Sequence, residues 1–224
     1  MQKRFVITVD GPVGVGKNTV CEIVAEKLNC AYLNSGSLFR AVAFIAEQQK
    51  YTPAHETVHE FLEDFPVQFK IVDQKLQITY QHEILFDELY TANISKKSSE
   101  VSRTPEIRMF VHSTLRELAK ETSLIIDGRD AGSHIFPLAD YKFYIDAKPE
   151  IRAHRRYLQS IANGEKISEA EVLKQIMERD FNDENKGEYS LRIYPGQIVI
   201  DTGTISAYDV AMQIISYIPK SYYI

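Results

Sequence analysis

The sequence FVITVDGPVGVGKNTVCEIV, residues 5–24, decides the fold of this 224-residue chain. Residues 5–9 are apolar or β-branched and end at Asp10, which predicts a short buried strand. Apolar residues recur at helical spacing after Lys17, which predicts a helix. A strand, a glycine-rich turn and a helix together are the context in which G-x-x-x-x-G-K marks a phosphate-binding loop. We therefore expect this stretch to bind a nucleotide rather than to form a plain turn.

Three features of the loop favour an anionic ligand. Its glycines carry no Cβ, so backbone N–H groups can converge on a phosphate. The N-terminus of the following helix adds favourable partial charge, and Lys17 adds a full positive charge. The loop residues expected to bind the nucleotide are Gly11, Pro12, Val13, Gly14, Val15, Gly16, Lys17, Asn18 and Thr19.

The residue after the lysine departs from the usual motif, which has Ser or Thr there. This chain has Asn18, and the hydroxyl comes one position later, at Thr19. A magnesium ion is therefore expected to be held less directly, through water or by Thr19. Asp127 follows residues 123–126, which end in an apolar run, and it resembles the strand-end acid that orders Mg²⁺ in phosphate-loop enzymes. Thr19 and Asp127 are the candidate Mg²⁺ ligands.

Composition is that of an ordinary soluble globular protein of one domain, with 44% apolar and 25% charged residues. The net charge of −5 gives no global attraction to nucleic acid or membrane, so a bound polyanion must meet local arginines. Cys21 and Cys30 lack metal-site spacing and favour buried thiols in a reducing compartment. No apolar run approaches membrane-spanning length. We expect a cytoplasmic monomer.

Predicted strands at residues 31–33, 123–126, 142–145 and 197–200 join the first strand, and helices alternate with these five. The fold class is therefore α/β. From about residue 61 to residue 90 the apolar pattern changes to period two, in three short runs. This pattern predicts a small antiparallel sheet, interpreted as an inserted subdomain too small to be stable alone.

Two predicted helices in the first half of the chain carry candidate site residues. Ser35 or Ser37 can cap the first of them. Arg40 lies in its second turn, where a cation is unfavourable unless an anion is close by. A Thr-Pro-Glu sequence at residues 104–106 predicts the start of the second helix, whose core-facing residues leave Arg108 on another side.

Polar residues also gather after a buried strand and on a later helix. The sequence DGRD, residues 127–130, follows the predicted strand at residues 123–126, and ligands of α/β sheets bind at the carboxyl ends of strands. Two acids and an arginine in that loop favour a site over solvation. Arg152, Arg155 and Arg156 fall within one arc of a predicted helix, where the alternative is a solvated basic face.

A further predicted helix starts at a capping box formed by Ser168 and Glu171. Along it, Arg179, Asp183 and Lys186 stand at i, i+4 and i+7 and share one face. An Arg–Asp pair at this spacing can simply support the helix. Because Lys186 lines up with that pair, an edge of the helix that faces a ligand is an equally good interpretation.

The charged residues outside the loop suggest phosphoryl transfer. No nucleophile–base pair with an orienting acid is evident, whereas arginines are numerous: Arg40, Arg108, Arg129, Arg152, Arg155, Arg156 and Arg179. Phosphoryl transfer asks a protein mainly for positioning and charge neutralisation. A phosphate acceptor is largely a dianion at neutral pH and needs no activating base. A kinase of nucleoside monophosphates meets these requirements.

Six motifs resemble those of bacterial-type cytidylate kinases in order and approximate spacing, from about residue 7 to residue 201. They are VDGPVGVGKNT, NSGSLFR, SEVSRTPEIR, IDGRDAG, IRAHRRYLQ and MERDFNDEN. The resemblance implies a P-loop kinase fold with a five-stranded parallel sheet flanked by helices and a small antiparallel insertion. It further implies one domain over residues 1–224, with the loop at 10–19, a monophosphate-binding region at about 34–122 that contains the insertion at about 61–90, and a lid at about 150–187.

The resemblance also implies the reaction and its residues. ATP, with Mg²⁺, would phosphorylate CMP or dCMP to CDP or dCDP. The implied catalytic residues are Lys17, Arg129, Arg152 and Arg156. The acceptor would be bound at its phosphate by Ser35, Arg40 and Arg129, at its base by Ser99, Arg108 and Asp130, and at its ribose by Arg179 and Asp183.

Three positions depart from the family pattern. Lys186 stands where the family often has an arginine, and a lysine lacks the planar two-pronged donor. Its expected contact with the base therefore differs from that of the family. Asn34 replaces the usual aspartate before the serine, and Phe39 replaces a tyrosine.

The chemistry of cytosine supports the base assignment separately. The N4 amino group donates while N3 and O2 accept, so a reader needs a carboxylate together with Arg or Ser donors. Asp130, Arg108 and Ser99 supply that set. One alternative is a related kinase that accepts UMP. A GTPase-like switch or nucleotide sensor is less favoured, because the NKGE sequence at residues 185–188 follows a helix and no D-x-x-G occurs.

Overall fold

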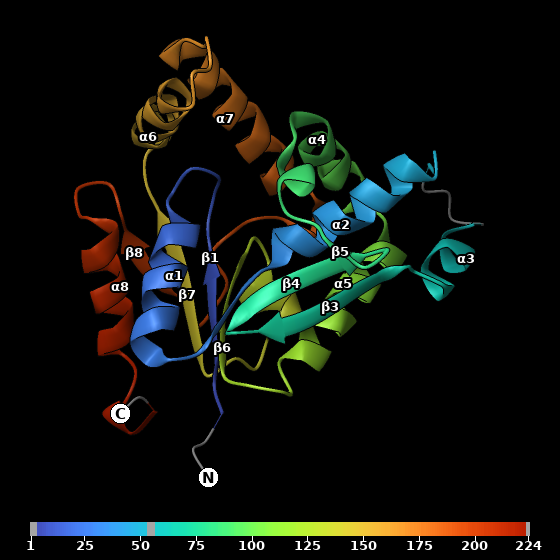
Figure 1. Cartoon of the computed structure of the whole chain (residues 1–224). Coiled ribbons are helices and arrows are strands. Elements are labelled where there is room, and N and C mark those ends of the chain that lie inside the picture. Colours follow the sequence, from blue (N-terminus) through green and yellow to red (C-terminus); the bar gives the residue numbers. More distant parts are fainter. Residues whose placement is uncertain (1–3, 53–56, 223–224) are drawn as a thin grey trace. The chain divides into compact units, whose positions relative to one another are not determined.

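The computed structural model describes residues 4–52 and 57–222 of the chain (Figure 1). The chain divides into two compact units, one formed by Met1–Asn29 with Ile125–Ile224 and the other by Cys30–Leu124. Within the described ranges, no helix is long and apolar enough to cross a membrane.

The first unit contains a parallel sheet. Its strands, in spatial order, are β6 (Leu124–Gly128, from Ile125 onward in this unit), β1 (Val6–Asp10), β7 (Tyr141–Asp146) and β8 (Ile198–Asp201). β1 pairs in parallel with β7, and β7 pairs in parallel with β8. The strands form because their apolar residues, such as Ile7, Val9 and Phe143, are fully buried. Parallel pairing brings the carboxyl ends of these strands to one edge.

Four helices accompany this sheet: α1 (Lys17–Leu28), α6 (Pro149–Ala162), α7 (Glu169–Glu184) and α8 (Ala207–Ser216). α1 packs against α8, and α6 packs against α7. The capping box predicted at Ser168 and Glu171 is confirmed at the start of α7. A π-helical turn, Ala131–Ile135, follows β6, and the 3₁₀ turns Gly187–Tyr189 and Lys220–Tyr222 lie farther along the chain.

The second unit starts with β2 (Ala31–Asn34) and α2 (Ser35–Gln48), followed by α3 (Val58–Glu63). The hairpin β3 (Val67–Val72) and β4 (Lys75–Tyr80) comes next, with the short strand β5 (Glu83–Ile84). The 3₁₀ turn Asp87–Tyr90 and the helices α4 (Ala92–Val101) and α5 (Pro105–Leu118) complete the unit.

The three period-two runs form antiparallel strands as predicted, because β3 pairs with β4 and β4 pairs with β5. They do not form a separate small sheet, however. β4 also pairs in parallel with β2, where Tyr32 stands opposite Lys75 and the Tyr32 N–H donates to the Gln74 carbonyl at 3.0 Å. Pairing with β2 satisfies backbone groups that an isolated hairpin would leave at an open edge.

Packing against α2 supplies the core that the hairpin cannot make alone. Ala41 and Ile45 of α2 pack with Val67, Ile78 and Leu85, and each of these residues is buried. Partly buried aromatic side chains surround this cluster. Burial of apolar area in the cluster therefore holds the hairpin in place.

Both connections of the hairpin strands use left-handed backbone without glycine. Asp73 and Gln74, between β3 and β4, have φ of 49° and 62°. Gln81 and His82, between β4 and β5, have φ of 48° and 70°. Two left-handed residues in succession match the right-handed twist of flanking antiparallel strands, which explains these two-residue turns.

Helix starts in the second unit differ from the sequence prediction in one respect. The cap of α2 is Asn34, whose side-chain oxygen accepts from the Ser37 N–H at 3.1 Å. The prediction that Ser35 or Ser37 caps the helix is therefore wrong, since both lie buried inside the first turn. α5 begins at Pro105 as predicted, although the Thr104 side chain makes no capping hydrogen bond.

The predicted α/β class is confirmed. All five strands of the predicted parallel core are present, as β1, β2, β6, β7 and β8. The described residues hold eight strands, because β3, β4 and β5 add to these five. Organisation as one functional domain over residues 1–224 stays a prediction.

Candidate active site

The loop between β1 and α1 has the backbone that its glycines allow. A Cβ on Gly11, whose φ is +154°, would lie 2.2 Å from the carbonyl oxygen of Ile145, so no other residue fits there. Gly16 has a φ of 95° and immediately precedes α1, which begins at Lys17. The predicted strand, turn and helix are therefore in place, with the N–H groups of a helix N-terminus behind the loop.

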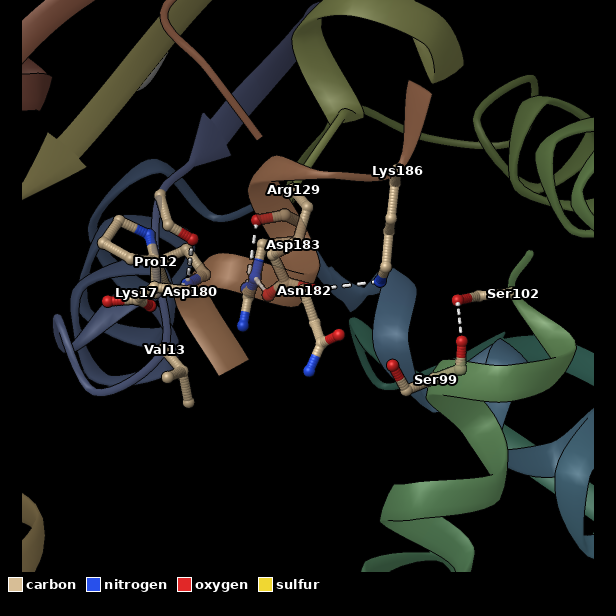
Figure 2. Close-up of polar contacts among 12 residues, drawn as sticks. Pro12, Val13, Lys17, Ser99, Ser102, Arg129, Asp180, Asn182, Asp183 and Lys186 are labelled. Carbon is tan, nitrogen blue, oxygen red and sulfur yellow. Dashed lines mark hydrogen bonds and ion pairs between the residues drawn. The ribbon is translucent and has the colours of Figure 1, made fainter. Parts of the chain in front are cut away.

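Lys17 is folded back across its own loop. Its Nζ donates to the carbonyl oxygens of Gly11 and Pro12, both at 2.7 Å, and the side chain is buried (Figure 2). Burial, followed by the positive charge of Arg129, lowers the pKa of the Lys17 ammonium to about 7, while Asp127 and other acids oppose this shift. Within the described residues, Lys17 Nζ therefore donates to neutral carbonyls of the loop and not to a carboxylate.

Nucleotide binding is expected to bring a proton onto Lys17. With a pKa of about 7, Lys17 in the free protein is mostly neutral at pH 8, whereas a phosphate beside it favours the charged form. ATP binding at pH 8 should therefore be accompanied by measurable proton uptake. Calorimetry in buffers of different ionisation enthalpy measures this uptake.

The matched control is Lys17→Arg, since an arginine stays protonated throughout. Its uptake should be near zero at the same pH. Equal uptake by the two proteins would mean that another group takes the proton. Above pH 7 the affinity of the wild-type protein for ATP should fall, because binding must then include protonation.

Asp10 ends β1, directly before the loop, and the sequence did not single it out as a site residue. Its Oδ1 accepts from the Ala131 N–H at 2.8 Å, and its Oδ2 accepts from the Gly132 N–H at 2.8 Å and from Gln197 Nε2 at 2.9 Å. Burial raises the pKa of the Asp10 carboxyl to about 6, against the hydrogen bonds from Gly132 and Ala131. The sequence signal that could have identified Asp10 as a site residue is a charged residue at the end of an apolar strand.

Arg129, Asp183 and Lys186 form one ionic group in the first unit. Arg129 Nε donates to Asp183 Oδ2 at 2.8 Å, and Lys186 Nζ donates to Asp183 Oδ1 at 2.9 Å (Figure 2). Burial would raise the pKa of the Asp183 carboxyl, but Arg129 and Lys186 overcome it and hold the pKa well below its usual range. Burial would likewise lower the pKa of Arg129, which Asp183 instead raises.

This group joins the loop after β6 to the end of α7. The predicted single helix face of Arg179, Asp183 and Lys186 is wrong for Lys186, because α7 ends at Glu184 and Lys186 follows it. Arg179 lies on the same helix and is partly buried. The Asp183 carboxylate is bonded by a residue 54 positions away, so it does more than support its own helix. Three predicted acceptor-binding residues, Arg129, Asp183 and Lys186, are thereby brought together.

Arg152 is buried and bound on several sides. It makes a two-pronged pair with Asp180, at 2.7 and 3.1 Å, and donates through Nε to the Ala147 carbonyl at 2.8 Å. It also donates to the Val13 carbonyl of the phosphate-binding loop at 3.0 Å. The side chain is therefore not part of a solvated basic face, and it ties α6 to α7 and to the loop.

The other two arginines of the arc behave differently. Arg155 donates to the hydroxyl of Thr202 at 3.2 Å and to its carbonyl, which anchors α6 to the segment after β8. Arg156 is exposed to solvent. Helical spacing placed the three arginines on one arc, but partners far away in sequence give Arg152 and Arg155 separate environments.

The candidate magnesium ligands fit an ion held mainly by phosphates and water. Thr19 is exposed in the first turn of α1, and Asp127 is buried at the end of β6. Across the described ranges, no group of three or more His, Cys, Asp or Glu residues could hold a metal. Mg²⁺ usually keeps several waters and takes only one or two carboxylates besides substrate phosphates. One carboxylate and one hydroxyl are therefore compatible with it.

In the second unit, Arg40 is oriented by a tyrosine that the sequence did not reveal. Its guanidinium lies 5.0 Å from the centre of the Tyr90 ring, and the Tyr90 hydroxyl is 2.9 Å from the Ser37 hydroxyl. Cation–π attraction favours this position of the guanidinium over the ring. The first turn of α2, which contains Ser35, is thereby linked to the 3₁₀ turn before α4.

Arg108, on α5, is buried. Its Nε donates to the Ser102 carbonyl at 3.0 Å, and its guanidinium lies 5.3 Å from the centre of the Phe39 ring. Ser102 in turn donates through its hydroxyl to the Ser99 carbonyl at 2.9 Å (Figure 2). Arg108 and Ser99, two predicted base readers, are therefore connected through Ser102.

A buried lysine at the start of a helix, behind a glycine-rich turn, defines a phosphate-binding-loop α/β protein. Residues 7–220 match the cytidylate kinase family. The cytidylate kinases of Oleidesulfovibrio alaskensis and Halalkalibacterium halodurans are each 34% identical to this chain. The alignments cover 96% and 97% of this chain, and 99% of each relative. The chain therefore belongs to the cytidylate kinase family.

A solved structure shares the fold. The crystal structure of an uncharacterized protein from Eubacterium ventriosum ATCC 27560 superposes with a TM-score of 0.52 at 15% identity. The match covers 96% of this chain and 98% of that one. At such low identity the likeness concerns the fold alone.

Proposed function

We propose that this protein transfers a phosphate group from ATP to CMP or dCMP and releases CDP or dCDP. The observation that carries the proposal is Lys17, buried at the N-terminus of α1 in a glycine-rich loop of a chain that matches the cytidylate kinase family over residues 7–220. The donor nucleotide binds the loop at residues 10–19. Mg²⁺, with Thr19 and Asp127 nearby, would neutralise charge on the phosphates.

The proposed chemistry depends on exchange of partners at the loop. Phosphate oxygens replace the Gly11 and Pro12 carbonyls as acceptors from Lys17, and charge-assisted bonds are stronger than those to neutral carbonyls. The acceptor phosphate is an anion that competes with Asp183 for Arg129. No general base is required, because the acceptor phosphate is already ionised.

Recognition of the base follows from hydrogen-bond types. Asp130 is proposed to accept from the N4 amino group of cytosine, with Arg108 and Ser99 donating to N3 and O2. Asp130 and Arg108 are both buried. A wrong base would leave their polar groups unpaired at a cost in free energy, which favours cytosine over other bases. The remaining proposed acceptor contacts are made by Ser35 and Arg40, by Arg129, and by Arg179, Asp183 and Lys186.

A coupled assay of ATP with each common nucleoside monophosphate tests the proposal. CMP and dCMP should be phosphorylated with much higher kcat/KM than UMP, AMP or GMP. Preference for UMP would support the related kinase instead. Nucleotide binding without transfer to any monophosphate would contradict the proposed reaction and favour a sensor. A monomeric state, cytoplasmic location and lack of nucleic-acid binding stay predictions.

The helices α6 and α7 are proposed to act as a lid over the phosphates. A ligand that joins two nucleotides should then slow amide exchange over residues 152–183 more than ATP alone does, since closure excludes water. Hydrogen exchange followed by mass spectrometry measures this difference. α8, at Ala207–Ser216, is the internal control and should not change. Equal amide exchange of residues 152–183 in the free and the ligand-bound protein would contradict the lid proposal.

A further inference from the structure

The Asp10 carboxylate joins three separate segments of the first unit. Its two oxygens accept from Ala131 and Gly132, which start the turn after β6, and from Gln197, which precedes β8. The side chain is almost fully buried, so each bond is made away from solvent. These contacts span 121, 122 and 187 positions along the chain.

The turn at Ala131–Ile135 depends on this carboxylate for its first donors. Within the turn, the N–H groups of His134 and Ile135 donate to the Asp130 carbonyl, at 2.9 and 3.2 Å. The N–H groups of Ala131 and Gly132 come too early in the turn to find a carbonyl there and donate to Asp10 instead. A buried N–H group without an acceptor is costly, so loss of Asp10 should displace the turn.

The orientation of Gln197 shows that Asp10 must accept. The Tyr194 N–H donates to Gln197 Oε1 at 2.7 Å, which leaves only the amide Nε2 to face Asp10. All partners of the carboxylate that the structure describes in this contact are therefore obligate donors. An asparagine at position 10 would turn its NH₂ group toward at least one of these donors. Two donors would then face each other without an acceptor.

Close packing fixes the same turn from its other side. A Cβ on Gly132 would lie 2.7 Å from the Thr8 hydroxyl oxygen, 3.2 Å from Asp10 Oδ2 and 3.3 Å from Gln197 Nε2. The backbone at residue 132 thus lies directly against β1. Arg129 and Asp130, immediately before the turn, take their positions from it.

We propose that Asp10, supported by Gln197, is a positioning residue that sets Arg129 and Asp130 for the acceptor nucleotide while its own backbone leads into the phosphate-binding loop. The inference rests on the proposed function, because Arg129 and Asp130 are the proposed readers of the acceptor. Asp10 touches neither nucleotide. It acts by holding the turn that follows β6 against the strand that precedes the loop.

Asp10→Asn tests this role, because it should weaken the binding of CMP much more than the binding of ATP. The KM for CMP should rise at least about tenfold and kcat/KM for CMP should fall about a hundredfold, whereas the Kd for ATP should change less than about threefold. General loosening of the fold would instead weaken both substrates together and lower Tm. Asp201→Asn is the matched control, since Asp201 also ends a strand and accepts a nearby backbone N–H, from Gly203, and it should behave as the wild type.

A second substitution should partly reverse the first. Gln197→Glu in the Asp10→Asn background supplies an acceptor for the new amide and should recover kcat/KM for CMP about tenfold. Gln197→Glu alone places two carboxylates together and should lower it. Should Asp10→Asn fail to fold, Gly132→Ala displaces the same turn and is expected to raise the KM for CMP in the same way.

The outcomes separate the two proposals. Lack of CMP phosphorylation by the wild-type protein would contradict the proposed function whatever the variants do. With an active wild type, an unchanged KM for CMP in Asp10→Asn, or in Gly132→Ala if the first variant does not fold, would overturn the positioning role. Equal weakening of ATP and CMP would also overturn it.

Discussion

Lys17→Ala is expected to lower turnover with ATP and CMP by about a thousandfold while the protein stays folded. Lys17 is the one full charge in the sequence of loop residues 11–19, and it is buried beside the carbonyls of Gly11 and Pro12. Charge moves onto the bridging phosphate oxygens during transfer, so its interaction with the lysine strengthens in the transition state. Removal of one preorganised donor of this kind costs about 10²–10³ in kcat, and the loss of full charge adds to it.

Steady-state kinetics of wild type and variant, with circular dichroism as the check of folding, measure the effect. Lys27→Ala is the matched control, because Lys27 lies exposed in the last turn of the same helix. Stability should not fall greatly with Lys17→Ala, since burial disfavours the charged lysine in the free protein. A folded variant with the turnover of the wild type would show that the loop does not hold the transferred phosphate.

The second large effect is expected from Asp130→Asn, which should narrow the preference for CMP over UMP. A carboxylate accepts from the N4 amino group of cytosine but repels the O4 of uracil, whereas an amide can donate to O4. Sites that leave a buried polar group unpaired reject analogues by factors on the order of 10⁴. The CMP activity should drop steeply, and the ratio of the two kcat/KM values should narrow at least about tenfold, or roughly 1.4 kcal/mol.

Both monophosphates must be measured on both proteins to decide this. Asp64→Asn, at an exposed aspartate, serves as the control for loss of one negative charge. Equal loss with CMP and UMP would mean that Asp130 positions Arg129 or the turn and that another group reads the base. Asp10→Asn offers a useful comparison, because it displaces the turn that follows Asp130 and leaves the Asp130 carboxylate itself in place.

Local patterns predicted the elements that carry the site. The apolar run before Asp10, the glycines and the helical spacing after Lys17 identified β1, the loop and α1. Such signals lie within about one helical turn or one strand, where sequence spacing fixes which side chains share a face. The capping of α2 was misassigned by one residue, because Asn34 and Ser35 are both good caps and stand next to each other.

Contacts between distant segments could not be predicted in this way. Arg152 is paired with Asp180, 28 positions away, and no periodicity connects α6 with α7. Asp10 bonds residues in two segments beyond position 130, so its role appears only in the folded chain. The period-two pattern likewise identified β4 without revealing that β2 is its neighbour. Tertiary packing chooses such partners among many that local chemistry allows.

The left-handed turns of the hairpin offer a route to a more heat-resistant kinase. Asp73, Gln74, Gln81 and His82 occupy backbone conformations that Asn and Gly adopt at lower cost. The backbone conformation of each turn therefore costs about 1 kcal/mol or more. Asn-Gly at either connection should lower this cost, and neither turn holds a residue assigned to the reaction. Protein engineers can thus adjust thermal resistance here and catalysis elsewhere, as two separate design problems.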